Sequence, residues 1–202
     1  MTLRTDSSPA VAETAMVHNV HRRATALLAD ATASDVAPSD AVGALRDLVV
    51  AMLQHHHGME DRDLWPMLTA ASPPLAAPLA DLTREHDRLD AALDRVADGP
   101  SPAAAAELRD LVHEHLSHEE PVLFPALLDH VTDDEWKEFS QHVVATVPPV
   151  GLDLMMELMH EASHDGEVEL VLRHLPPEAR AQVPAMRAAA APTLATLRAT
   201  GR

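Results

Sequence analysis

Two segments of the sequence share one pattern of histidine, carboxylate and proline, and this repeat constrains the fold more than any other feature. Each segment reads His-x-x-x-Glu-acid-x-x-Leu-aromatic-Pro-x-Leu; the first begins at His56 and the second at His115, 59 residues later. In both, the histidine precedes the glutamate by four residues, so in a helix the two side chains lie on one face. The repeat therefore predicts two similar helices that form a symmetric site between them.

The remaining sequence predicts further helices around this repeat. Alanine and leucine dominate, and with only six glycines and few β-branched runs the sequence is typical of an all-α protein. Prolines, glycines and cap residues such as Ser101 divide the first two thirds of the chain into four helices joined by short loops. We expect these helices to form an up-down-up-down four-helix bundle. The predicted helices span residues 11–30, 41–70, 75–97 and 102–130.

The sequence changes in character after residue 131. A capping box at Thr132-Asp133-Asp134-Glu135 predicts the start of a further helix. Proline pairs then bracket one or two short, methionine-rich helices, and an alanine-rich tail follows as a helix or a frayed end. We therefore expect a bundle of residues 11–131 and a helical extension of residues 132–202. The extension is expected to pack on the bundle or on a partner, such as a second copy of the chain.

Composition excludes several classes of function. The chain has 32 acidic residues against 15 Lys and Arg, a net charge of −17, which argues against nucleic acid or an anionic membrane as a partner. The absence of cysteine excludes disulfides, thiolate zinc fingers, iron–sulfur clusters and a cysteine nucleophile. There is no apolar run of ~18 residues and no hydrophobic signal segment at the N-terminus, so we expect a cytoplasmic protein.

The repeat itself supplies four candidate metal ligands, which are His56, Glu60, His115 and Glu119. An imidazole and a carboxylate on one helix face bind one cation together, or the carboxylate bridges two cations. A glutamate that points into a bundle core without a partner is costly, so these side chains need cations or other partners there. Nitrogen and carboxylate ligands without sulfur suit iron or manganese and do not exclude zinc.

The other two predicted helices offer further ligands. The third helix contains His86, and the first contains His18 and His21, between which periodicity alone does not choose. The site then has four histidines and two glutamates, with open positions for water, a bridging oxygen or a small ligand. His55 and His57 flank the first histidine of the repeat, so we expect both to point away from the site.

The order of these residues resembles that of the hemerythrin-like HHE cation-binding domains. Segments 55–66 and 119–125 are typical of the second and fourth helices of that family. The sequence around His18 resembles the first helix of the family and favours His18 over His21 as a ligand. The resemblance covers residues 11–130 and implies the fold of a hemerythrin-like bundle.

The resemblance also implies a non-haem di-iron centre. Its cofactor would be two iron ions joined by an oxo or hydroxo bridge, with two histidines on each ion and two glutamates shared between the ions. The implied ligands are His18 and His56 on one iron, His86 and His115 on the other, and Glu60 and Glu119 as bridges.

One departure from the family bears on function. Oxygen-carrying hemerythrins have a second histidine on the third helix, where this chain has Asp90, so the site is one histidine short and Asp90 or water fills the place. Carriers also have an aspartate five residues after the histidine of the fourth helix, whereas this chain has Glu119 at four. The expected function is therefore a reaction with oxygen, with peroxide in a catalase-like manner, or with nitric oxide. The alternative is a non-catalytic iron or oxygen sensor that signals through residues 132–202.

Overall fold

Helices make up the regular structure of the chain. The computed structural model describes residues 8–163 and 167–199, and every element within them is helical. The predicted all-α class is therefore confirmed. Over the same residues, no helix combines the length and the apolar character that a membrane span requires.

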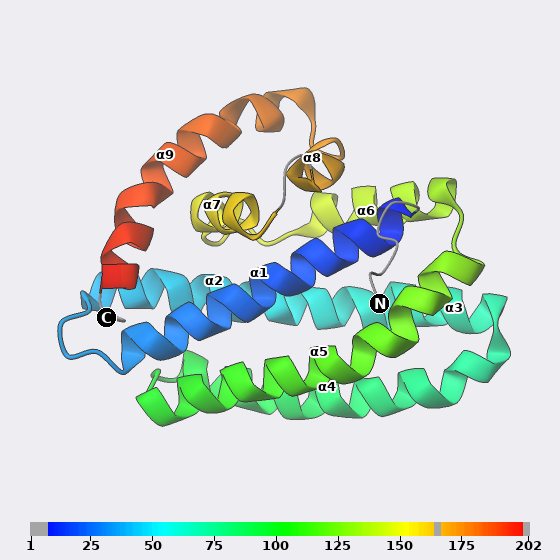
Figure 1. Ribbon diagram of the computed structural model, residues 1–202, viewed down its shortest axis with the longest axis horizontal. Helices are drawn as coiled ribbons and strands as arrows, with labels where there is room; N and C mark the ends of the chain where they lie inside the picture. The colour runs from blue at the N-terminus through cyan, green and yellow to red at the C-terminus, as the bar shows by residue number, and fades with distance from the viewer. Residues whose placement is uncertain (1–7, 164–166, 200–202) are drawn as a thin grey trace, which may run out of the picture.

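Four helices pack together as a bundle. They are α1 (Pro9–Thr32), α2 (Ser39–Met59), α4 (Ala76–Ala97) and α5 (Pro102–His130), and a short 3-10 turn, η2 (Pro73–Leu75), precedes α4. Both α1 and α4 pack against α2 and against α5, so each helix of the bundle has two neighbours. The chain reverses direction from each of these helices to the next (Figure 1).

The second helix of the bundle contains a wide turn at the first repeat. α2 passes into the π-helical turn η1 (Glu60–Leu64) and then into α3 (Trp65–Ala71). The backbone N–H of Trp65 bonds to the carbonyl of Glu60, five residues earlier, directly before Pro66, which has no N–H to donate. Such π turns frequently occur at functional sites. The second repeat differs, because α5 stays α-helical through its prolines.

A polar layer divides the apolar core of the bundle into two clusters. One cluster contains Leu45 and Leu89, and the other contains Trp65 and Leu123. Between the residues of the first cluster and those of the second, α2 carries the buried His57, η1 carries Glu60, α4 carries His86, and α5 carries Glu119. Close-packed side chains on both sides therefore fix the spacing of the helices at the polar layer.

Two predicted helix starts are confirmed. The side chain of Ser101 accepts a hydrogen bond from the backbone N–H of Ala104 at the start of α5. Thr132 and Glu135 form a reciprocal capping box at the start of α6. Each side chain satisfies a backbone donor that has no partner within its helix.

The C-terminal helices pack on one side of the bundle. They are α6 (Asp133–Thr146), α7 (Leu152–Ala162), α8 (Glu167–Leu172) and α9 (Pro177–Ala199). All four contact α1, and α7 and α9 also contact α2; α9 arches above α7 in Figure 1. The predicted tail is thus helical to Ala199, its last three residues lie outside the described part, and the division of the chain at residue 131 stays a prediction.

A buried carboxylate on α1 holds two of these helices to the bundle. Glu13 is 3% exposed, and its Oε2 accepts hydrogen bonds from Trp136 Nε1 and Ser140 Oγ, each at 2.9 Å. Its Oε1 accepts from Arg173 at 2.7 Å and lies 3.2 Å from Nε2 of His174. Because one carboxylate satisfies donors from α6 and from the segment after α8, the extension is fixed against α1 at this point.

Candidate metal centre

The two histidine–glutamate pairs of the repeat meet in the polar layer. His56 Nε2 lies 3.3 Å from Glu60 Oε1, and His115 Nε2 lies 3.1 Å from Glu119 Oε2. The spacing of four residues on each helix produces these two contacts.

The second oxygen of each glutamate faces a histidine of another helix. Glu60 Oε2 lies 3.5 Å from His86 Nε2, and Glu119 Oε1 lies 3.5 Å from His18 Nε2. The structure therefore brings together all six side chains that the sequence selected. Each carboxylate directs one oxygen to the pair His18 and His56 and the other oxygen to the pair His86 and His115, an arrangement that fits two cations with shared carboxylates.

Several buried polar atoms in this layer lack hydrogen bonds. Leaving such atoms unpaired away from water is costly, and a bound cation removes that cost. Ligand atoms ~2.1 Å from one cation lie ~3.0–3.4 Å apart, close to the histidine–glutamate distances of 3.1–3.5 Å found here. The residues therefore fit metal ions. Among the six side chains that the sequence selected, the buried atoms without a hydrogen bond to any described residue are His18 Nε2, His56 Nε2, Glu60 Oε2, Glu119 Oε1 and Glu119 Oε2.

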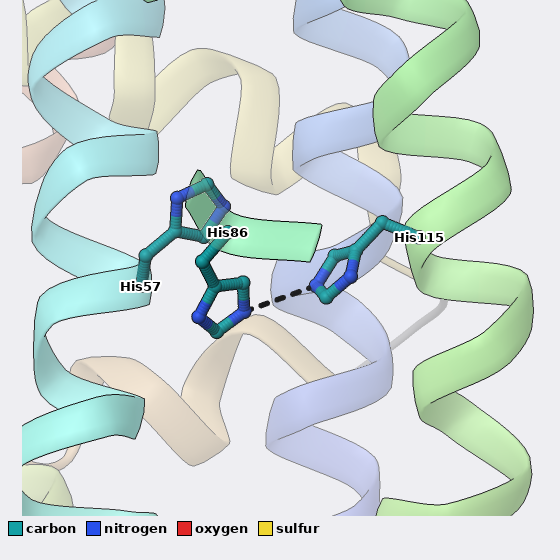
Figure 2. A group of neighbouring side chains, drawn as sticks. All are labelled: His57, His86 and His115. Carbon is teal, nitrogen blue, oxygen red and sulfur yellow. Dashed lines mark hydrogen bonds between the residues drawn. The ribbon is translucent and has the colours of Figure 1, made fainter. Parts of the chain in front are cut away.

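A third histidine joins the pair His86 and His115. His57 is 2% exposed, and it offers a ring nitrogen within 4.8 Å of one nitrogen of each of the other two. Figure 2 shows the three imidazoles converging from α2, α4 and α5, with His86 Nε2 and His115 Nε2 3.2 Å apart. The ring of His57 stacks on that of His86, with centroids 4.4 Å apart. The expectation that His57 points away from the site is therefore wrong.

The reason lies in the packing of α2. Consecutive residues of a helix point ~100° apart, and α2 packs against α1 on one side and α4 on another. His56 faces α1, where its ring centroid is 5.4 Å from that of His18, while His57 faces α4. A bundle helix with two neighbours has two inward faces, so adjacent residues such as His56 and His57 can both point inward.

Asp90 positions His57. Its Oδ1 lies 3.0 Å from His57 Nδ1, and this hydrogen bond lowers the pKa of Asp90. Asp90 belongs to neither group of potential ligands and is half exposed. The aspartate that stands where oxygen carriers have a histidine thus holds a histidine from a neighbouring helix at the site. Two features of the sequence could have indicated the role of His57: the aspartate at position 90, and the histidine that directly follows His56.

Carboxylates outside the polar layer hold the Nδ1 atoms of four inward-facing histidines. An imidazole that donates its Nδ1–H outward keeps the Nε2 lone pair directed inward, as metal-binding histidines do. The four Nδ1–carboxylate pairs are His18–Glu120 at 3.1 Å, His57–Asp90 at 3.0 Å, His86–Asp61 at 3.1 Å and His115–Glu85 at 3.0 Å.

Two of these carboxylates belong to the repeat itself. Asp61 and Glu120 directly follow the two inward-facing glutamates, and the sequence left open whether they face solvent. In the structure, Thr83 donates to Asp61 at 2.6 Å and Arg22 donates to Glu120 at 2.7 Å, which orients both carboxylates toward the histidines of neighbouring helices. Each copy of the repeat therefore supplies an inward histidine, an inward glutamate and an outer carboxylate that orients a histidine of a neighbouring helix.

The two glutamates differ in acidity. Burial and the charge of Glu119 raise the pKa of Glu60 well above its usual value. Burial acts in the same direction on Glu119, but His18 and His115 outweigh it and lower the pKa of Glu119 to about 2. Of the two, Glu119 therefore loses its proton first, and a divalent cation that binds here competes with a proton at Glu60.

Burial also favours the neutral form of two of the candidate ligand histidines. It acts with the neighbouring His57 and His115 to lower the pKa of His86 to about 4. It acts with nearby histidines to lower the pKa of His56 well below its usual value. The neutral imidazole is the form that binds a metal ion.

Comparison with known families agrees with this chemistry. The family model described as the Hemerythrin HHE cation binding domain matches residues 12–127. The chain belongs to this family. The match covers the whole polar layer and ends before α6, and it confirms the resemblance found in the sequence. Neither the search of curated proteins nor the search of solved structures gives a match. A helical domain of the HHE family binds cations; the assignment of individual ligands stays a prediction.

Proposed function

We propose that this HHE domain is a non-haem di-iron protein that reacts with oxygen, peroxide or nitric oxide. The observation that supports this most is the position of Glu60 and Glu119, each with one oxygen toward either group of histidines. A single cation uses only one oxygen of each carboxylate in that arrangement, whereas two cations use all four. Iron suits a site of imidazole and carboxylate without sulfur.

The two ions would have different surroundings. His18 and His56 would hold one, and His57, His86 and His115 would hold the other, with both glutamates shared. Bound iron would supply two redox-active ions with room for an exogenous ligand. The chain contributes the rest: burial favours the neutral form of His56 and His86, outer carboxylates orient four of the imidazoles, and the burial of His57, His86 and His115 excludes water from one side of the site.

Access favours the ion at His18 and His56. The side chain of His56 is 15% exposed, whereas those of His57, His86 and His115 are 2–3% exposed. A cavity borders His56 and Glu60 but does not reach the three histidines of the other group. Oxygen and nitric oxide are small and apolar enough to enter through its apolar wall, so we place the exchangeable position on this side.

The test is a comparison of iron content and reactivity between two histidine variants of α5. The full chain is loaded with iron(II) without air and then mixed with oxygen, hydrogen peroxide or nitric oxide while the absorbance is followed. His115→Ala should lose at least one of two irons and any peroxide turnover. His113→Ala, an exposed position two residues away, should keep both. Full iron content and reactivity in His115→Ala would sink the proposal.

A second candidate function is a non-catalytic sensor, and one contact favours it. Glu13 and His18 lie on the same helix, and Glu13 binds Trp136 and Arg173 of the extension. A shift of α1 caused by iron or oxygen would therefore reach residues 132–202. The test is limited proteolysis with and without iron and air. A sensor changes its protease protection in that segment without peroxide turnover, and an unchanged digestion pattern rejects this candidate.

A further inference from the structure

A cavity of about 370 Å³ separates the bundle from its C-terminal helices. Residues of α1 and α2 line one side of it, and residues of α6, α7 and α9 line the other. Valine and methionine are the most frequent residues of its walls. Methionine side chains are flexible and polarisable, so they adapt to apolar molecules of irregular shape. Six of the nine methionines in the chain line the cavity: Met52, Met59, Met155, Met156, Met159 and Met186.

The size of the cavity exceeds the needs of the reactants considered above. A water molecule takes a share of ~30 Å³ in the liquid, and diatomic gases are of similar size. Cavities that hold small organic ligands span ~300–1,000 Å³ and are lined mainly by apolar side chains with a few polar groups. This cavity meets both criteria, and its apolar wall offers water few hydrogen bonds.

One polar side chain of the wall has no partner. His21 is 1% exposed, and neither of its ring nitrogens makes a hydrogen bond with any described residue. Its ring centroid is 4.4 Å from that of His56, but it does not belong to the group His18, His56, Glu60 and Glu119. The buried carboxylate of Glu13 also lines the wall, and it already accepts hydrogen bonds from the extension.

The two unbonded nitrogens of His21 define the polar group that suits it. An imidazole with one N–H group donates through one nitrogen and accepts through the other. A hydroxyl group also donates and accepts, whereas a carboxylate accepts only and adds a negative charge beside Glu60 and Glu119.

We propose that this cavity binds an apolar organic molecule that ends in a hydroxyl group, of the class of medium-chain alcohols. The apolar body lies against the methionines and valines, and the hydroxyl group bonds to His21 beside the metal centre. The site thus places an organic ligand within reach of the position where we expect oxygen or peroxide to react. Binding itself depends on the cavity and on His21, whatever metal the chain holds.

The experiment is isothermal titration calorimetry of 1-nonanol into the full chain, once metal-free and once loaded with iron. We expect one saturable site per chain in both forms and weaker binding of nonanoate. Val143→Trp, which fills the cavity from α6, should reduce the affinity at least tenfold. Val150→Trp, at a half-exposed position outside the cavity, should leave it unchanged. His21→Leu replaces the imidazole with an apolar side chain of similar size, so only the hydrogen bond is lost. The affinity should fall about five- to tenfold.

A second measurement does not depend on a variant that fills the cavity. The chain has two tryptophans, of which Trp136 lines the cavity and Trp65 does not. A brominated alcohol, 9-bromo-1-nonanol, should saturably quench the fluorescence of Trp65→Phe and leave that of Trp136→Phe unquenched.

Three results would overturn the proposal: no saturable binding of 1-nonanol, equal binding by Val143→Trp, or tighter binding of nonanoate. Because the metal-free chain is tested as well, failure here is distinguishable from failure of the di-iron proposal. Binding without iron uptake would reject the di-iron proposal alone.

Discussion

The two halves of the metal centre arise from one repeated motif, yet they differ in support and in access. In the half formed by His57, His86 and His115, a carboxylate holds every Nδ1 atom, and all three side chains are almost fully buried. In the half formed by His18 and His56, His18 alone has such a partner among the residues that the structure describes, and His56 borders the cavity. In the di-iron centre that we propose, the first half would hold an ion firmly, and the second would leave room for an incoming molecule.

The difference has a specific origin in the sequence. The position that corresponds to His57 in the second repeat, 59 residues later, is Leu116, which is buried in the apolar core. Likewise Glu85, which precedes His86, supports His115, whereas Val17, which precedes His18, has no carboxylate to offer His56. The repeat thus supplies two matching sets of inward side chains, and single residues that differ around them make one half closed and the other open.

The largest effect should follow from removing a group that belongs to both halves. Glu119 is fully buried and faces His18 and His115, so Glu119→Ala should lose both metal ions. Metal content per chain measures this. Glu114→Ala, at an exposed position of the same helix, should keep both ions. Retention of two ions in Glu119→Ala would contradict the shared role of this carboxylate.

Removing His57 should affect one half alone. His57→Ala removes a nitrogen ligand from the closed half and should lower the affinity for the ion there more than ~100-fold. Loss of an outer carboxylate typically costs only ~10–100-fold. The other ion should stay bound. Stepwise iron(II) titration resolves the two affinities. An unchanged titration would mean that His57 only packs against His86.

A smaller loss should follow when Asp90 is altered. Asp90→Asn removes the charge that orients His57 and should lower the affinity for the same ion by ~10–100-fold. Asp87→Asn, at an exposed position on the same helix, serves as the matched control. If Asp90 acts only through His57, the double variant binds iron as His57→Ala does. A further loss in the double variant would point to Asp90 as a ligand in its own right.

The smallest effect is a difference in titration between two adjacent histidines of the metal-free chain. His86 should stay neutral down to a pH of about 4, because burial and its histidine neighbours depress its pKa. Burial opposes protonation of His115 too, but Glu119 and Glu85 outweigh it and raise its pKa above the usual value. Nuclear magnetic resonance of the imidazole protons measures both.

The two histidines also affect stability with opposite sign. His86 binds fewer protons in the folded than in the unfolded chain between pH 6.5 and about 4, so its contribution to stability falls as the pH falls through that window. The contribution of His115 is fully present below pH 6.5 and is lost as the pH rises through its raised pKa. Coincident titration of the two rings would contradict the asymmetry of their surroundings.

The helical fold and the six inward side chains could be predicted from the sequence because both depend on local periodicity. The i, i+4 spacing of His56 and Glu60 places them on one helix face wherever the helix packs. Capping at Ser101 and Thr132 is equally local. These features need no knowledge of which helices are neighbours.

The features that the sequence did not predict depend on tertiary packing. His57 faces inward only because α4 covers a second face of α2. The cavity exists only because the extension packs beside His21, and the periodicity of α1 carries no trace of it. The π turn at Glu60 also departs from the period of 3.6 residues of a regular α-helix, so the sequence pattern did not predict it.

The most direct test of the account is an anomalous-difference map at the iron edge from crystals of the iron-loaded chain. The account predicts two peaks, one between His18 and His56 and the other between His57, His86 and His115, with Glu60 and Glu119 reaching both. A single peak, or a second ion without His57 among its neighbours, would contradict it.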